Sequence, residues 1–258
     1  MKAKNSVSQP GSQARSASLS LPDLCLHCVK QQQCFLAQLD GHLGTATDAG
    51  SPLNVEIKTY RAGHYVVRQG EPRTSLPMVC QGLIVVTTLS EAGDEVVLQA
   101  CGVGKFVGLT DWLQGRETYS ISGRTLIETT VAFVKPEDLL HRVEMDPRLL
   151  TSLLRQVGFQ MHALEHRLGR QTVQDASGRV IYFLLDLVRQ LGILGEKDVA
   201  LPIRLSRTVI AEFAGLRRET VSRVLTHLQK KRLLVQSDRH ITIPYLSRLQ
   251  KALHRAAE

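Results

Sequence analysis

Residues 205–236 constrain the fold of this chain more than any other stretch: LSRTVIAEFAGLRRETVSRVLTHLQKKRLLVQ. Ser206 is a good N-cap for a first short helix, and Gly215 can form the turn that ends it. A second helix is predicted from about 217 to 230, because its apolar residues recur at spacings of three and four (Val221, Val224, Leu225 and Leu228). Two short helices joined at a glycine predict a helix-turn-helix.

The outward face of the second helix carries side chains that can read base pairs. They lie in its first two turns and are Arg218, Glu219, Ser222 and Arg223. Arginine can bond guanine twice, glutamate can accept from the cytosine amine, and serine can bond either kind of partner. We therefore predict that this helix enters the major groove of double-stranded DNA. The next segment, RLLVQSDRHITIP, predicts a β-hairpin wing that turns at 237–240.

The charge of the chain supports this assignment. Residues 201–258 contain twelve Lys and Arg and four Asp and Glu, an excess of +8 that equals the net charge of the whole chain. The first two hundred residues are therefore neutral overall. A positive charge concentrated in one domain indicates that this domain meets a polyanion.

The remaining composition excludes a membrane protein and a secreted one. No run of eighteen apolar residues exists, and the basic N-terminus lacks the apolar core of a signal peptide. We expect a cytoplasmic protein, in which cysteine thiols stay reduced. No nucleophile, base or metal-ligand spacing of an enzyme stands out, so the chain is predicted not to be an enzyme.

A long helix is predicted to begin at Asp146-Pro147, since Asp suits a cap and Pro suits the first turn. Apolar residues follow it at alternating spacings of four and three (Leu150, Leu154, Val157, Met161, Leu164 and Leu168). This is the seam of a two-stranded coiled coil and favours a homodimer. Gly158 and Gly169 weaken the helix, and a helix packed only on its own domain is the alternative.

Short segments rich in Val, Ile and Thr occupy residues 55–134. They are VEIKTY, HYVVRQ, LIVVTTL, EVVLQA and TTVAFV, and glycine-containing turns separate them. Strands at this spacing without long intervening helices predict a small antiparallel barrel or roll.

Three of the five cysteines lie within ten residues, CLHCVKQQQC, as Cys25, Cys28 and Cys34. Residues 1–20 are rich in Ser, Gln and Ala, and nothing else in the first fifty residues looks structured, so a pliable segment is expected. In a reducing compartment such a cluster indicates metal or redox chemistry more than a structural disulfide. Both an iron–sulfur cluster and zinc accept closely spaced thiolates. A C-x2-C oxidoreductase would need a strand-to-helix setting, which is absent around Cys25.

The order of β-roll, long helix and winged helix-turn-helix resembles the cyclic-AMP receptor/FNR family of bacterial transcription regulators. The most specific stretches are RRETVSRVLTHLQ and LSEAGDEVVLQACGVGKFVGL, and the resemblance covers about residues 55–245. It implies an α+β fold with an N-terminal antiparallel β-roll (a double-stranded β-helix, cupin-like), a dimerisation helix and a C-terminal winged helix. It also implies a palindromic operator and contact with RNA polymerase.

The spacing C-x2-C-x5-C resembles the N-terminal cluster of the FNR branch. This resemblance implies an oxygen-labile [4Fe–4S] cluster that favours a DNA-binding dimer when intact. In that branch the fourth cysteine lies in a late strand, where this chain has Ala132. Cys101, beside a glycine loop, is our expected substitute. Cys80 and a ligand other than cysteine stay open, as does a zinc site or thiol switch on the same scaffold.

The sequence disfavours cyclic AMP as the effector. Nucleotide-binding relatives carry Gly-Glu-Leu and Arg-Ser-Ala, whereas this chain reads Gly104-Lys105-Phe106 and then GRETYSISGRT. The ribose-binding carboxylate and the phosphate-binding guanidinium are therefore missing, although Arg116 or Arg124 could substitute. An unidentified small molecule in the β-roll remains a further alternative.

The operator follows from the same resemblance. The FNR branch reads TTGAT-type half-sites with residues matching Glu219, Ser222 and Arg223, while Arg218 resembles the cyclic-AMP receptor branch, which reads TGTGA-type half-sites. A two-fold dimer would read half-sites about 34 Å apart.

Five regions are predicted along the chain. They are a disordered tail (1–20), a cysteine-bearing cluster segment (21–52), a β-roll sensor domain (53–145), a dimerisation helix (146–173) and a winged helix-turn-helix domain (174–258).

Overall fold

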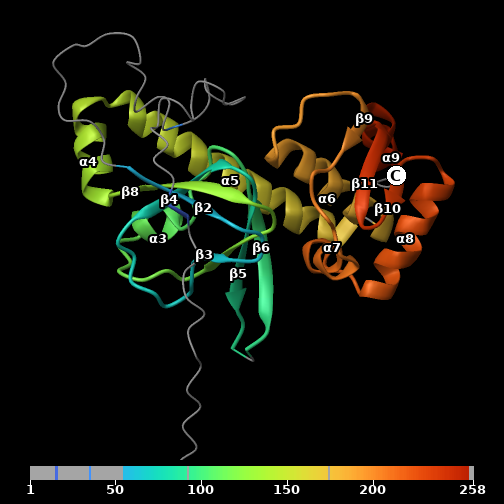
Figure 1. Cartoon of the computed structure of the whole chain (residues 1–258), viewed down its shortest axis with the longest axis horizontal. Coiled ribbons are helices and arrows are strands. Elements are labelled where there is room, and N and C mark those ends of the chain that lie inside the picture. The colour runs from blue at the N-terminus through green and yellow to red at the C-terminus, as the bar shows by residue number, and fades with distance from the viewer. Residues whose placement is uncertain (1–14, 17–34, 36–54, 92, 174, 256–258) are drawn as a thin grey trace, which may run out of the picture.

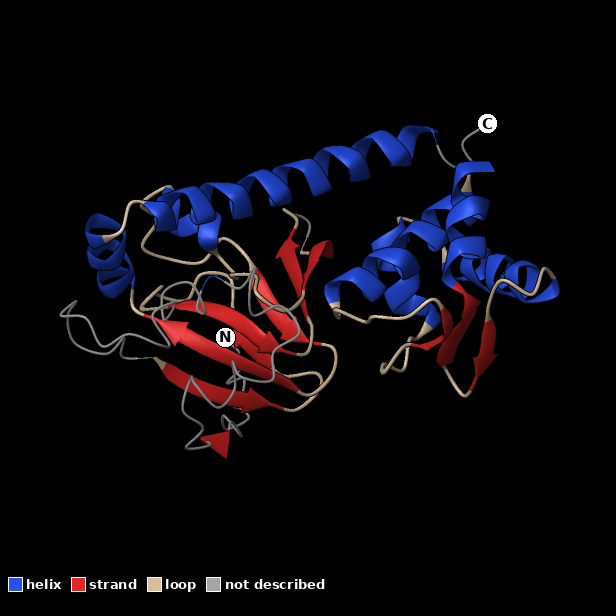
Figure 2. Ribbon diagram, turned by 90° about the horizontal axis from the view of Figure 1, so that it is seen from above, coloured by secondary structure: helices blue, strands red, loops and turns tan. Residues whose placement is uncertain are grey.

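The computed structural model describes residues 15–16, 35, 55–91, 93–173 and 175–255. A β-roll and a smaller helical domain lie side by side, and the long helix α5 (Arg148–Val173) runs from one to the other (Figures 1 and 2). Cys25, Cys28 and Cys34 fall outside the described residues. Within those residues, no helix is long and apolar enough to cross a membrane.

The β-roll consists of two antiparallel four-stranded sheets that pack face to face. One sheet has the order β1-β2-β8-β4 and the other β3-β7-β5-β6. The strands are β1 (Arg15–Ser16), β2 (Glu56–Tyr60), β3 (Tyr65–Val67), β4 (Leu76–Gln81), β5 (Ile84–Leu89), β6 (Glu95–Cys101), β7 (Ser122–Thr125) and β8 (Thr129–Val134). This architecture confirms the predicted β-roll and the α+β fold class.

Two strands of the roll were not predicted. β4 contains Pro77 and few β-branched residues, and β7 is the short polar segment SGRT. β4 pairs with β8 at the edge of its sheet and β7 lies between β3 and β5, so their neighbours supply the ladder that their own composition does not indicate.

Arg15 and Ser16 lie within the tail that we predict to be disordered. These residues form β1, which pairs with Thr59 and Lys58 of β2. The open edge of β2 offers unpaired backbone groups, and such an edge recruits any nearby extended segment.

The helix α4 (Pro136–Met145) connects the roll to α5, and the short helix α3 (Leu109–Leu113) lies between β6 and β7 of the roll. The start of α5 follows the predicted cap, because the Asp146 carboxylate accepts from the Arg148 backbone N–H at 3.0 Å. Leu149 and Leu153 are buried against the roll, so the first turns of α5 belong to the core of that domain.

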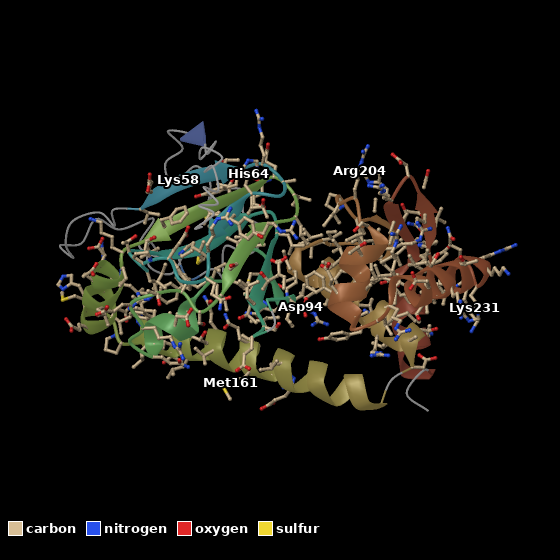
Figure 3. The ribbon with its side chains drawn as sticks, turned by 90° about the horizontal axis from the view of Figure 1, so that it is seen from below. Lys58, His64, Asp94, Met161, Arg204 and Lys231 are labelled. Atoms are coloured by element: carbon tan, nitrogen blue, oxygen red, sulfur yellow. The ribbon has the colours of Figure 1, made fainter. Side chains whose placement is uncertain are left out.

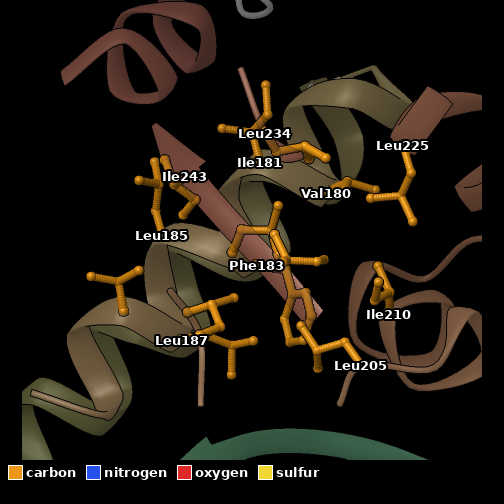
Figure 4. Packing of buried hydrophobic residues seen from close by; sticks show 14 of the residues in the cluster. Val180, Ile181, Phe183, Leu185, Leu187, Leu205, Ile210, Leu225, Leu234 and Ile243 are labelled. Atoms are coloured by element: carbon orange, nitrogen blue, oxygen red, sulfur yellow. The ribbon is translucent and has the colours of Figure 1, made fainter. Parts of the chain in front are cut away.

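The C-terminal domain surrounds one hydrophobic core, shown in Figure 4. Its elements are α6 (Ala176–Gln190), β9 (Lys197–Ala200), α7 (Arg207–Ala214), α8 (Arg218–Lys230), β10 (Val235–Ser237), β11 (His240–Tyr245) and α9 (Leu246–Arg255). Val180 and Phe183 of α6 meet Ile210 of α7 and Leu225 of α8 in this core. The sequence did not predict β9 or α9.

Local interactions fix the helix-turn-helix as predicted. The Ser206 hydroxyl accepts from the Val209 N–H at 3.1 Å, and Gly215 ends α7 with φ 61°. A residue with a Cβ is strained in that left-handed conformation, which explains the glycine. The wing forms by pairing of β10 with β11, and Asp238 and Arg239 make its turn with positive φ.

Candidate nucleic-acid interface and sensing site

The predicted DNA-reading residues occupy one face at the start of α8. Arg218, Glu219 and Arg223 are exposed and Ser222 is half-buried, while Val221 and Leu225 are buried beneath them. The helix is held from behind by the domain core, and its polar face is left to solvent. This arrangement allows the first two turns of α8 to contact base edges in a major groove.

The cations of this domain have few internal partners. Among residues 201–253, Arg204 pairs with Asp238 at 3.6 Å, and no other Lys or Arg forms an ion pair. Figure 3 shows Arg204 and Lys231 projecting from the domain into solvent. Positive charge that is not neutralised within the protein is available to phosphates, so the domain has the surface of a DNA-binding module.

The predicted seam of α5 is exposed along most of its described length. Leu150, Leu154, Met161 and Leu164 are all exposed, with Leu154 at 62% and Met161 at 58%. Figure 3 shows Met161 pointing away from the body of the molecule.

Val157 departs from this pattern. It is half-buried and packs against the core of the roll beside Leu153. One stripe of the helix therefore packs on its own domain, and the neighbouring stripe faces solvent. The side chain of Leu168 lies outside the described part of the chain.

Cys101 does not have the environment of a metal ligand. Its side chain is 0% exposed, inside the roll among Val79, Ile84 and Val131. Burial raises the pKa of the thiol to about 11, although Lys105 lowers it somewhat. Iron and zinc bind the thiolate, which this interior disfavours. The geometry thus argues against our expectation that Cys101 supplies the fourth ligand.

Cys80 lies in a different part of the roll and is only half-buried. It packs against the cluster that contains Met78, Ala132 and Phe35, and its thiol lies 3.9 Å from the Met78 carbonyl oxygen. Met78 and Ala132 face each other on β4 and β8. Cys80 is therefore on the strand next to Ala132, at the same cluster.

Phe35, the residue after Cys34 in the sequence, is part of this cluster. The ring is 1% exposed and packs edge-on against Phe106, with centroids 5.5 Å apart. In the described residues, no three His, Cys, Asp or Glu side chains gather as a metal site.

The two domains are joined by backbone contacts at the end of α6. The Gln190 carbonyl oxygen accepts from the Val103 N–H at 3.3 Å, and the Gln190 side chain accepts from the Gly102 N–H at the same distance. A Cβ on Gly102 would collide with the Gln190 carbonyl group. Glycine is therefore required here, so that α6 can approach the loop after β6.

Arg116, a candidate substitute for the phosphate-binding guanidinium, is engaged in internal contacts. Asp111 is 3% exposed, and its carboxylate accepts from both the N–H and the hydroxyl of Ser120, at 2.9 and 2.6 Å. Arg116 donates to Gln114 at 2.9 Å and lies 3.8 Å from Asp111. The guanidinium of Arg116 therefore already lies beside a carboxylate of the roll.

Two family models match the chain in agreement with this structure. The model of the cyclic nucleotide-binding domain matches residues 57–146, and the model of the Crp-like helix-turn-helix domain matches residues 178–252. Together they cover the roll and the DNA-binding domain in the order seen here. The chain belongs to the CRP/FNR family. It is a DNA-binding transcription regulator of that family.

Curated members of the CRP/FNR family are similar over most of their length. The transcriptional activator protein anr of Pseudomonas aeruginosa is 27% identical over 220 residues, which cover 84% of this chain and 88% of that protein. The cAMP-activated global transcriptional regulator CRP of Salmonella typhimurium is 24% identical over 187 residues, 72% of this chain and 89% of that protein.

A solved CRP/FNR structure shares the fold. FixK2 from Bradyrhizobium japonicum superposes with a TM-score of 0.66 at 24% identity and covers 77% of this chain and 97% of its own. At this identity the likeness establishes the fold only.

Sequence reasoning missed Phe35 and Gln190. A single aromatic residue in a polar segment was a detectable signal for Phe35. Gln190 carries no such signal, because its role arises from the approach of α6 to the Gly102 loop.

Proposed function

We propose that this regulator senses oxygen or redox state through a [4Fe–4S] cluster held by Cys25, Cys28, Cys34 and Cys80. One observation carries the proposal. Phe35 is buried in a group of hydrophobic side chains, and Cys80 packs against the same group. Because Phe35 directly follows Cys34 in the sequence, its burial there supports Cys80 as the fourth ligand.

The chemistry of the donor set fits such a group. Four thiolates are the usual ligands of a [4Fe–4S] cluster. Cys80 is half-buried, whereas Cys101 is sealed inside the roll. The bound cluster would supply the oxygen-sensitive chemistry, and the four cysteines would hold it.

The proposed output is a change in dimerisation. The exposed apolar stripe of α5 (Leu150, Leu154, Met161 and Leu164) fits a second copy of the same helix, and this gives the two-fold symmetry that a palindromic operator needs. The side of the roll that contains Phe35 and Cys80 adjoins this helix, because Leu149 and Leu153 of α5 pack in the same hydrophobic core as Phe35.

We also propose that cyclic AMP is not the effector. Neither Arg116 nor Arg124 lines the cavity of about 300 Å³ to which the roll contributes, and Arg116 instead lies 3.8 Å from Asp111. Isothermal titration of the protein with cyclic AMP should give no binding heat. A micromolar dissociation constant would contradict this part of the proposal.

Anaerobic purification tests the cluster directly. We expect a brown protein with about four iron and about four acid-labile sulfide per chain, which loses its colour in air. A colourless anaerobic protein with one zinc ion per chain would replace the cluster with the zinc alternative. A metal-free protein whose operator affinity changes with a disulfide reductant would replace it with the thiol switch.

A further inference from the structure

The turn of the helix-turn-helix is held from outside by Arg179 of α6. One Nη atom of its guanidinium donates to the Gly215 carbonyl oxygen at 3.2 Å, across 36 positions of sequence. Gly215 ends α7, and α8 begins three residues later with Arg218. A side chain of the supporting helix therefore bonds the short link between the two helices that together form the DNA-reading module.

The start of α8 lacks the local cap that the neighbouring helices have. The Asp175 carboxylate caps α6 by accepting from the Gly178 N–H at 2.7 Å, and Ser206 caps α7. At the corresponding position of α8, Arg217 makes no side-chain cap hydrogen bond. The direction in which α8 leaves the turn is therefore less fixed by its own residues, and a bond from another helix has more influence on it.

The helix α6 holds the same pair of helices at a second point, one turn further along. Phe183 of α6 stacks on Phe213 of α7, with ring centroids 4.7 Å apart. Arg179 and Phe183 are four residues apart, so they lie on one face of α6. This face therefore contacts both the end of α7 and the turn that follows it.

The guanidinium of Arg179 is kept in this place at a cost. Its Nε atom is buried and has no hydrogen-bond partner among the described residues. A buried donor without a partner destabilises the fold, so packing alone does not account for an arginine here. The hydrogen bond that this guanidinium does make goes to the carbonyl oxygen of Gly215.

A small change at this turn moves the reading residues by a distance that matters for hydrogen bonds. Arg223 lies eight residues beyond Gly215, which is about 12 Å along a helix. A tilt of about 10° at Gly215 would displace the backbone of Arg223 by about 2 Å over that length. Hydrogen bonds to base edges tolerate much smaller displacements, so the angle between α7 and α8 decides whether they form.

We propose that Arg179 is a positioning residue for base reading, which it serves without touching the DNA. Its bond to the Gly215 carbonyl oxygen sets the angle at which α8 leaves α7. That angle aligns Glu219, Ser222 and Arg223 with the base edges. The proposal rests on the reading of bases by α8, and it is independent of the cysteines and of the proposed cluster.

Gel-shift titrations of full-length, anaerobically prepared protein test this role. The probes are a scrambled duplex and a palindrome of TTGAT-type or TGTGA-type half-sites, whichever the wild type binds more tightly. Arg179→Gln keeps a polar nitrogen at the Nε position and removes the Nη contact. It should lower the ratio of the two affinities by about fivefold or more, the least that one base contact supplies.

Two further variants make the test specific. Arg179→Lys keeps a donor near Gly215 and should recover most of the ratio. Arg189→Gln makes the same change of charge on the same helix and should leave the ratio at the wild-type value. Equal weakening on both duplexes, with a shallower salt dependence, would make Arg179 a phosphate contact instead. An unchanged ratio in Arg179→Gln would leave it without a role in reading.

Hydrogen exchange followed by mass spectrometry gives a readout that needs neither DNA nor a cluster. In Arg179→Gln, the amides of residues 216–221 should exchange faster, while those of residues 225–230 keep the wild-type rate. Faster exchange throughout the domain would indicate general destabilisation and contradict a local role. Should Arg179→Gln not fold, Arg179→Met removes the same contact and takes its place. Failure of both variants to fold would assign Arg179 to stability and overturn the proposal.

Discussion

The arginines of the β-roll and those of the DNA-binding domain have different environments. In the roll, Arg73 donates two hydrogen bonds to the Arg116 carbonyl oxygen, and Arg116 lies against Asp111 and Gln114. On α8, Arg218 and Arg223 are exposed and form no ion pair with a described residue. Positive charge in the roll thus maintains the fold, while positive charge in the DNA-binding domain is kept for a partner.

This contrast also explains why one function could be read from the sequence and the other could not. DNA reading depends on residues within two turns of one helix, so their order in the chain defines the site. Sensing, as we propose it, depends on residues that the fold brings together from distant segments, such as Phe35 and Cys80. A site of the first kind can be recognised in the sequence as a motif, whereas the residues of the second kind are scattered along the chain.

The largest expected effect is at the proposed sensing site. Cys80→Ser should abolish the oxygen response of a reporter and the brown colour of anaerobic protein, because three thiols remain for four irons. Cys101→Ser is the matched control and should keep both, since Cys101 is sealed in the core. The reverse result would return the fourth ligand to Cys101.

Alkylation at pH 8 gives an independent check on the same pair. Iodoacetamide reacts with thiolates. With a pKa of about 11, Cys101 should stay unmodified in the folded protein. Mass spectrometry of peptides should show modified Cys80 under the same conditions.

The next effect concerns the core that supports α8. Leu225→Ala removes a fully buried side chain and should cost about 2–5 kcal/mol of unfolding free energy. Leu194→Ala, at a residue that is 85% exposed, should change it by no more than about 0.5 kcal/mol. Urea denaturation followed by circular dichroism measures both, and equal effects would contradict the packing described here.

A smaller effect is expected at the DNA surface. Arg223→Ala should weaken operator binding by about 1–3 kcal/mol if the guanidinium bonds a base, and should relax the sequence preference. Arg248→Ala on α9 changes the same charge and should weaken specific and scrambled DNA equally. Gel-shift titrations with both DNAs measure this, and unchanged affinity would remove Arg223 from the reading set.

The smallest expected effect is at Glu212, where the DNA-binding domain meets the β-roll. Partial burial, followed by the charge of Glu95, raises the pKa of Glu212 above its ordinary value, and Arg124 opposes this. Because the pKa is raised in the folded state, the contribution of this residue to the free energy of unfolding is fully present below about pH 4.5. That contribution is lost as the pH rises.

Glu212→Gln should therefore raise the melting temperature at pH 8, by the equivalent of less than about 0.5 kcal/mol, and should have no effect at pH 4. Glu91→Gln, at an exposed position, is the control. Differential scanning calorimetry at both pH values checks the sign, and a gain at pH 4 alone would contradict it.

The sequence predicted most of the fold and placed the candidate DNA-reading residues at the start of one helix, because both depend on local patterns. Ser206, Gly215 and the spacing of Val221 and Leu225 act within a few residues of one another. β4 and β9 escaped prediction because they are strands only in the presence of their neighbours. Cys101 was chosen for its nearness to a glycine loop, and its burial is a property of the closed roll that spacing does not encode.

The burial of Phe35 also bears on how the proposed cluster would be rebuilt after damage. Cys25 lies ten residues before Phe35, which limits its distance from that anchor to about 36 Å even in a fully extended chain. Tethered groups at such range meet at effective concentrations of the millimolar order. Reassembly would then be an intramolecular event, and its rate would be set by the supply of iron and sulfide rather than by a search of the chain for its ligands.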